Sequence, residues 1–206
     1  MPSETAATST STLVLASASP RRRQLLDLIG LPFRVVPADV DEAPREGEGP
    51  VEYARRAARE KAAEVAHRCP DEPVLGADTV VDVDGRILGK PGSKREAEEM
   101  LHFLSGRDHL VHTALALMSD GSNRELFDTA TVRFVPLDNA TIGWYVETGE
   151  PMDKAGAYAI QGLGGLMVAS MTGSPHTVVG LPIHRLPELF EAHDLEFWKQ
   201  LNPVGQ

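Results

Sequence analysis

The chain has 206 residues and carries 20 Lys and Arg against 30 Asp and Glu, a formal net charge of −10. This balance disfavours general binding to nucleic acid or to an anionic membrane, although a local cluster of cations can still bind a small anion. With 42% hydrophobic and 24% charged residues, the composition is that of a soluble globular protein. A single cysteine, no apolar run near the about 20 residues of a membrane span, and a start without secretory features together predict a cytoplasmic location.

Apolar spacing predicts a sequence of strands and helices that mix without strict alternation. We expect residues 1–11 to form a flexible tail and residues 12–206 to form one domain. Strands are predicted over 12–16, 33–36, 73–77 continuing to 80–83, 86–88, 109–118 and 125–135, and helices over 20–29, 51–68, 93–104, 138–146 and 181–193. A Gly-rich stretch covers 156–173. The pattern indicates an α/β or α+β fold around a mixed sheet.

The first segment with a candidate chemical function is Ala16-Ser-Ala-Ser-Pro-Arg-Arg-Arg23. Ser19 suits the N-cap of the following helix and Pro20 its first position. The N-terminus of a helix presents unpaired N–H groups to an anion, and the planar fork of arginine fits phosphate oxygens. Three solvated arginines after an ordinary cap are the alternative. Because arginines at this end oppose the helix dipole, a bound anion explains them better.

Further along, isolated charged groups interrupt apolar patterns. Asp78 and Thr79 fall inside an apolar strand, where a carboxylate either has a partner or takes part in chemistry, and the sequence leaves both open. Lys61 falls on the alanine-rich face of its helix and needs a partner there, and Lys90 precedes a proline on a stiff segment. Glu42 belongs to an acidic loop that either supplies a metal ligand or is simply solvated.

Gln161 lies in the Gly-rich stretch, where glycines allow the backbone to approach a ligand closely. Its amide both donates and accepts hydrogen bonds, which suits the edge of a nucleobase. Without context, such a stretch is more often a set of turns. Taken together, the motifs fit a site for a ligand that carries a metal-bridged polyphosphate and a base that the protein recognises. They do not distinguish binding of this ligand from its hydrolysis.

The same residues carry a resemblance to the Maf family of nucleoside triphosphate pyrophosphatases. The matching motifs include LVLASASPRRRQLL, VLGADTVV, ILGKP and DKAGAYAIQGLGG, and the match runs from Leu13 to about Leu189. The resemblance implies a Maf/ITPase-like α/β fold, with an elongated mixed β-sheet flanked by helices and two lobes around a deep cleft. It also implies hydrolysis of a nucleoside triphosphate to the monophosphate and diphosphate, with a divalent cation (Mg²⁺ or Mn²⁺) as cofactor. Dimers are common in the family, so the resemblance leaves a homodimer open.

The resemblance also assigns roles to individual residues. Asp78 matches the family's proton acceptor, which activates water, and Glu42 matches an acidic residue near the metal, which Asp78 would share. Residues tied to substrate choice are matched by Arg21, Thr79 and Gln161, and phosphate-contacting residues are matched by Ser17, Arg22, Lys61 and Lys90. The pair Thr79 and Gln161 resembles the branch that acts on dTTP and UTP. Pro175 stands where the family often has tyrosine, which puts the fine shape of that loop in doubt.

Two rival functions stay open at this point. The first is the same chemistry on modified or other nucleotides, such as 7-methyl-GTP. The second is a non-catalytic regulator of cell division that senses nucleotides without turnover. For an active enzyme, the biological task would be either the cleansing of nucleotide pools or the restraint of division.

Overall fold

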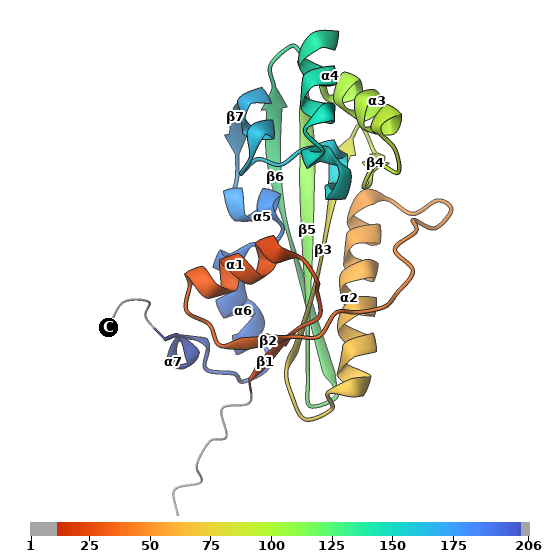
Figure 1. Cartoon of the computed structure of the whole chain (residues 1–206). Coiled ribbons are helices and arrows are strands. Elements are labelled where there is room, and N and C mark those ends of the chain that lie inside the picture. The colour runs from red at the N-terminus through yellow and green to blue at the C-terminus, as the bar shows by residue number, and fades with distance from the viewer. Residues whose placement is uncertain (1–11, 203–206) are drawn as a thin grey trace, which may run out of the picture.

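A mixed sheet of seven strands forms the centre of the computed structural model, which describes residues 12–202 (Figure 1). The strand order is β2-β1-β3-β5-β6-β7, and β4 pairs with β3 beside this path. The pairs β1–β2 and β1–β3 are parallel and the others are antiparallel. The strands are β1 (Leu13–Leu15), β2 (Phe33–Val35), β3 (Val74–Val83), β4 (Arg86–Leu88), β5 (Asp108–Ser119), β6 (Ser122–Phe134) and β7 (Val168–Thr172).

Helices cover the sheet in three groups, each with its own apolar cluster. The long helix α2 (Pro50–Arg68) packs against β3 and β5, and α1 (Pro20–Leu28) with α6 (Leu186–Glu191) packs on strands of the same sheet near β1. At the other end, α3 (Lys94–Leu104) and α4 (Asn139–Glu147) cover the sheet beside β4 (Figure 1). The remaining short helices are α5 (Pro175–Val179), α7 (Phe197–Gln200), η1 (Glu150–Asp153), η2 (Ala155–Ala157), η3 (Leu163–Met167) and η4 (Ile183–Arg185).

The predicted mixed sheet with flanking helices is confirmed, and most predicted elements lie within two or three residues of their expected bounds. The division into two lobes stays a prediction, as does the single domain. The expected tail at residues 1–11 lies outside the described residues. Among residues 12–202, no helix combines the length and the apolar character that a membrane span requires.

The main differences from the prediction lie in the last third of the chain, where α7 and the short helices η1, η2 and η3 were also not expected. The Gly-rich stretch contains strand β7, and helix α5 was not predicted. The helix expected over 181–193 is divided into η4 and α6. Pro187 explains the division, because it lacks the N–H that a continuous helix would donate to the carbonyl of Ile183. Proline is instead tolerated in the first turn of α6, where no such bond is needed.

Because Gly76 has no side chain, the backbone of α2 packs directly against the backbone of β3 at this position. A Cβ at this position would contact the carbonyl oxygen of Ala58 and would lie 2.8 Å from the backbone nitrogen of Ala62. Neither atom can rotate away, since both belong to the backbone of α2. This close approach sets the height of α2 over the strand, and Lys61 lies on the helix between these two alanines.

We expect Gly76→Ala to destabilise the protein by about 1–3 kcal/mol, because the added methyl group forces α2 away from the sheet. Thermal and urea unfolding measure the change. Gly143→Ala is the matched control. Gly143 lies inside α4 with open space around it, so alanine there should be neutral or stabilise by up to about 1 kcal/mol. Equal stability of the two variants would contradict this account of the helix–sheet contact.

Candidate active site

A cleft of about 650 Å³ opens along the side of β3, between the start of α1 and the segment around η2. Its charged lining is basic in excess, which contrasts with the acidic chain as a whole. Five basic and three acidic side chains line it: Arg21, Arg22, Lys61, Lys90 and Lys154, with Glu42, Asp78 and Asp153. The structure therefore brings every predicted site residue to one cavity, since Ser17, Thr79 and Gln161 also line it.

Asp78, Lys61 and Glu42 form the charged centre of the cleft. The ammonium of Lys61 donates to Asp78 Oδ1 at 2.7 Å and lies 2.9 Å from Glu42 Oε1. The side chains of Asp78 and Lys61 are both buried, whereas Glu42 is half-exposed. The partner that Lys61 was expected to need is thus this pair of carboxylates. Oδ2 of Asp78 has no hydrogen-bond partner within residues 12–202, so it is free to accept from water.

The loop that carries Glu42 is held by α2. Tyr53 donates from its hydroxyl to the carbonyl of Glu42 at 2.7 Å. Arg56 donates to the carboxylate of Glu48 at 2.6 and 2.7 Å and to the carbonyl of Ala43 at 3.0 Å. Sequence reasoning missed both anchors, although the helical spacing that places Tyr53 and Lys61 two turns apart on one face could have indicated Tyr53.

The charges around Glu42 favour its ionised form. Partial burial acts to raise the pKa of its carboxyl, but the ammonium groups of Lys61 and Lys90 lower it more, so the net shift is downward. Lys90 Nζ lies 3.4 Å from Glu42 Oε2 and is largely exposed, so its head is free to contact an anion in the cleft. Lys90 thus lies just after the β3–β4 hairpin, as the sequence predicts.

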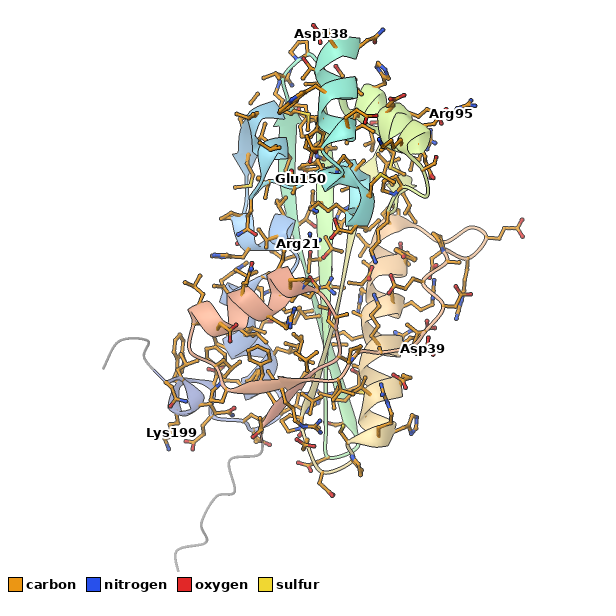
Figure 2. The ribbon with its side chains drawn as sticks, in the orientation of Figure 1. Arg21, Asp39, Arg95, Asp138, Glu150 and Lys199 are labelled. Atoms are coloured by element: carbon orange, nitrogen blue, oxygen red, sulfur yellow. The ribbon has the colours of Figure 1, made fainter. Side chains whose placement is uncertain are left out.

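At the start of α1, the hydrogen bonds differ from those predicted. Ser19 occupies the N-cap position, but its side chain makes no capping bond, and the Ser19 N–H donates to Ser17 Oγ at 3.2 Å. Arg21 lies below the segment that holds Glu150 in Figure 2, with Nη1 3.8 Å from the Asp153 carboxylate. Arg23 is exposed. Of the three arginines, Arg21 is therefore the one best placed to meet a ligand.

Arg22 points into the protein. It is buried and donates to the carbonyl of Gly180 at 2.8 Å, to Ser17 Oγ at 3.0 Å and to Thr79 Oγ1 at 3.2 Å. Burial lowers the pKa of its guanidinium, and the nearby Asp78 carboxylate only partly opposes this. Arg22 therefore contributes positive charge to the cleft floor while holding Ser17 and Thr79 in place, and its direct contact with phosphate stays a prediction.

The segment that carries Gln161 is fixed by Glu150. Its carboxylate accepts from the Tyr145 hydroxyl at 2.8 Å and from the N–H groups of Gly164 and Leu163 at 2.9 and 3.0 Å. Burial acts to raise the pKa of Glu150, but these donors lower it more. Gln161 itself is exposed to the cleft. The glycines of this segment thus belong to a clamped loop, and a distant carboxylate of this kind leaves no mark in the local sequence.

The residues present fit a divalent cation held jointly with a substrate. Glu42 and Asp78 supply carboxylate oxygens, the ligands that Mg²⁺ and Mn²⁺ prefer. Residues 12–202 contain no group of three or more His, Cys, Asp or Glu side chains that could hold a metal by themselves. Since Mg²⁺ is typically bound by one or two carboxylates plus substrate phosphates, this donor set suits binding of metal and nucleotide together.

Comparison with known proteins agrees with this site. A protein of Symbiobacterium thermophilum named dTTP/UTP pyrophosphatase is 50% identical over 86% of this chain and 91% of its own length. Proteins with the same name from two other bacteria also match. The one from Alcanivorax borkumensis is 48% identical over 91% of this chain and 98% of its own length, and the one from Myxococcus xanthus is 50% identical over 87% of this chain and 91% of its own length. The family model described as Maf-like protein matches residues 12–193. The chain therefore belongs to the Maf family.

Proposed function

We propose that this protein hydrolyses dTTP and UTP to the nucleoside monophosphate and diphosphate with the help of a divalent cation. The observation that carries the proposal is the buried Asp78 carboxylate, held on one oxygen by Lys61 and free on the other, at the floor of a basic cleft. The names of the Maf relatives support the reaction and the two nucleotides.

In the proposed reaction, Asp78 orients a water molecule and accepts its proton while the water oxygen attacks the α-phosphorus. The bond from the α-phosphorus to the oxygen that bridges to the β-phosphate breaks, so the monophosphate keeps the water oxygen and negative charge develops on the leaving diphosphate. Lys90 and Arg21 line the cleft and their side chains are partly exposed, so their charges would stabilise that diphosphate. Lys61 keeps the Asp78 carboxylate in place and adds a positive charge beside the reacting phosphate.

Glu42 and Asp78 would hold the cation. When bound, a divalent cation neutralises phosphate charge and polarises the P–O bonds. The two carboxylates already lie around one positive charge, the Lys61 ammonium. They therefore share a region that attracts cations and can turn toward a metal that arrives with the nucleotide.

Other features of the proposal concern location and partners. The single buried cysteine and the composition support a cytoplasmic location. The net charge of −10 opposes binding to nucleic acid, so the partner that the cleft suits is a small anionic nucleotide. A homodimer is part of the proposal on family grounds and would be measured by sedimentation.

Asp78→Asn should lower turnover of dTTP and UTP at least about 100-fold, because the amide cannot accept the proton of the attacking water. Lys61 keeps Glu42 as a partner, so the variant should still fold. Diphosphate release and circular dichroism measure the two effects. Asp84→Asn, an exposed position in the neighbouring hairpin, should retain full turnover. Near-normal turnover by Asp78→Asn would rule out the assigned role.

Gln161→Ala should reduce the preference for UTP over GTP about tenfold, because one hydrogen bond to the pyrimidine is lost. The measurement is kcat/KM for both nucleotides, with Gln24→Ala on the exposed surface of α1 as the control. An unchanged ratio would show that Gln161 does not read the base.

In the same panel, 7-methyl-GTP and ATP test the rival specificities, and tight binding without turnover of any nucleotide would favour the regulator.

Chelation should abolish turnover, and added Mg²⁺ or Mn²⁺ should restore it. The reason is that a cation held by Glu42 and Asp78 neutralises the charge of the triphosphate. Dialysis against EDTA followed by titration with each metal makes the measurement, with Ca²⁺ as a comparison. Binding of Mg²⁺ should be weak without nucleotide and stronger with it. Full activity in excess EDTA would contradict the metal proposal and leave the role of Asp78 to be judged separately.

A further inference from the structure

The hydroxyl of Thr79 is fully engaged inside the protein as a donor. Thr113 Oγ1 donates its single hydrogen to the carbonyl of Thr177 at 2.7 Å. The 2.9 Å contact between the hydroxyls of Thr79 and Thr113 must then be donated by Thr79. Thr79 also accepts from Arg22 at 3.2 Å. Its side chain therefore has no hydrogen left for a ligand, although Thr79 lines the cleft.

The backbone of Thr79 is differently placed, because β3 has an open edge at this point. β1 pairs with β3 only at Val74 and Leu75, and β4 pairs with it only from Val81 onward. The Ala16 N–H donates to the carbonyl of Leu75, which fixes the direction of that carbonyl toward this edge. N–H and C=O groups of alternate residues point the same way, so those of Thr79 point to the edge too.

β5 cannot satisfy these groups, since it pairs along the opposite edge of β3. Within residues 12–202, no strand covers the edge between Leu75 and Val81. An unpaired donor and acceptor next to apolar side chains is costly unless a ligand or water binds them. Val81, Val111 and Tyr158 provide such apolar surface in the cleft lining.

We propose that the backbone N–H and C=O of Thr79 bind the imide edge of uracil or thymine. This inference rests on the proposed function and explains its base preference. The imide presents an N3–H donor between two carbonyl acceptors. The carbonyl of Thr79 accepts from N3–H, its N–H donates to the C4 carbonyl, and the amide of Gln161 donates to the C2 carbonyl.

This recognition accounts for two properties at once. Uracil and thymine share the imide and differ at C5, so an edge that reads only the imide accepts both, as the relatives' names require. Cytosine carries an acceptor at N3 and an amine at C4. Both would meet groups of their own kind on the backbone of Thr79, and the buried polar atoms on each side would lose their partners.

The test compares UTP, CTP and N3-methyl-UTP as substrates of the wild-type protein and of Thr79→Val. Valine keeps the β-strand backbone and removes the hydroxyl. We expect kcat/KM for CTP and for N3-methyl-UTP to be about 10- to 100-fold lower than for UTP. The ratio of UTP to CTP should be the same in Thr79→Val as in the wild type, whatever the absolute activity of the variant.

Two results would overturn the inference while leaving the proposed function intact. Turnover of N3-methyl-UTP equal to that of UTP would show that N3–H is not read. Collapse of the UTP to CTP ratio in Thr79→Val would assign the selection to the side chain. If no nucleotide is hydrolysed, the proposed function fails, and calorimetric binding of UMP, CMP and N3-methyl-UMP decides the inference, with equal affinities overturning it.

Discussion

The ammonium of Lys61 between the carboxylates of Asp78 and Glu42 is the interaction on which the site depends. Removing one partner of a buried ion pair costs about 3–5 kcal/mol, because the remaining charge is left without compensation. Asp78 can therefore sit within the apolar sheet only where a helix brings a cation to it. Gly76 makes this approach possible, since it lets the backbone of α2 rest on β3 two residues before Asp78.

Local patterns were enough to predict much of this arrangement. Continuous apolar segments identified β3 and β5, and the Asp-Gly turn identified the β3–β4 hairpin that precedes Lys90. The isolated charge at Lys61 indicated that it needs a partner, whereas the sequence left open whether Asp78 has a partner or takes part in chemistry. The structure shows that the two side chains pair with each other. The sequence could not state this pairing, because it depends on the register of a helix on a strand seventeen positions away.

Long-range polar contacts account for what sequence reasoning missed. Glu150 looks like an ordinary surface acid, yet it fixes the loop of Gln161 through the N–H groups of Leu163 and Gly164. Arg22 has the same local context as Arg21, but α1 is rotated so that Arg22 points toward Gly180 and Thr79. Neighbouring arginines thus divide into one that faces the cleft and one that supports its floor, and only the packing of the helix decides which is which.

The charge of the cleft shows how an acidic protein can attract a polyanion. At physiological ionic strength, charges farther apart than about 8 Å are largely screened. The acidic side chains distributed over the surface therefore act weakly on a triphosphate in the cleft, whereas the five basic groups that line it act at close range. Asp78 and Glu42 reduce this excess, and a cation that arrives with the nucleotide would offset them. Net charge alone therefore excludes extended polyanions better than compact ones, because only a compact ligand fits wholly within the basic region.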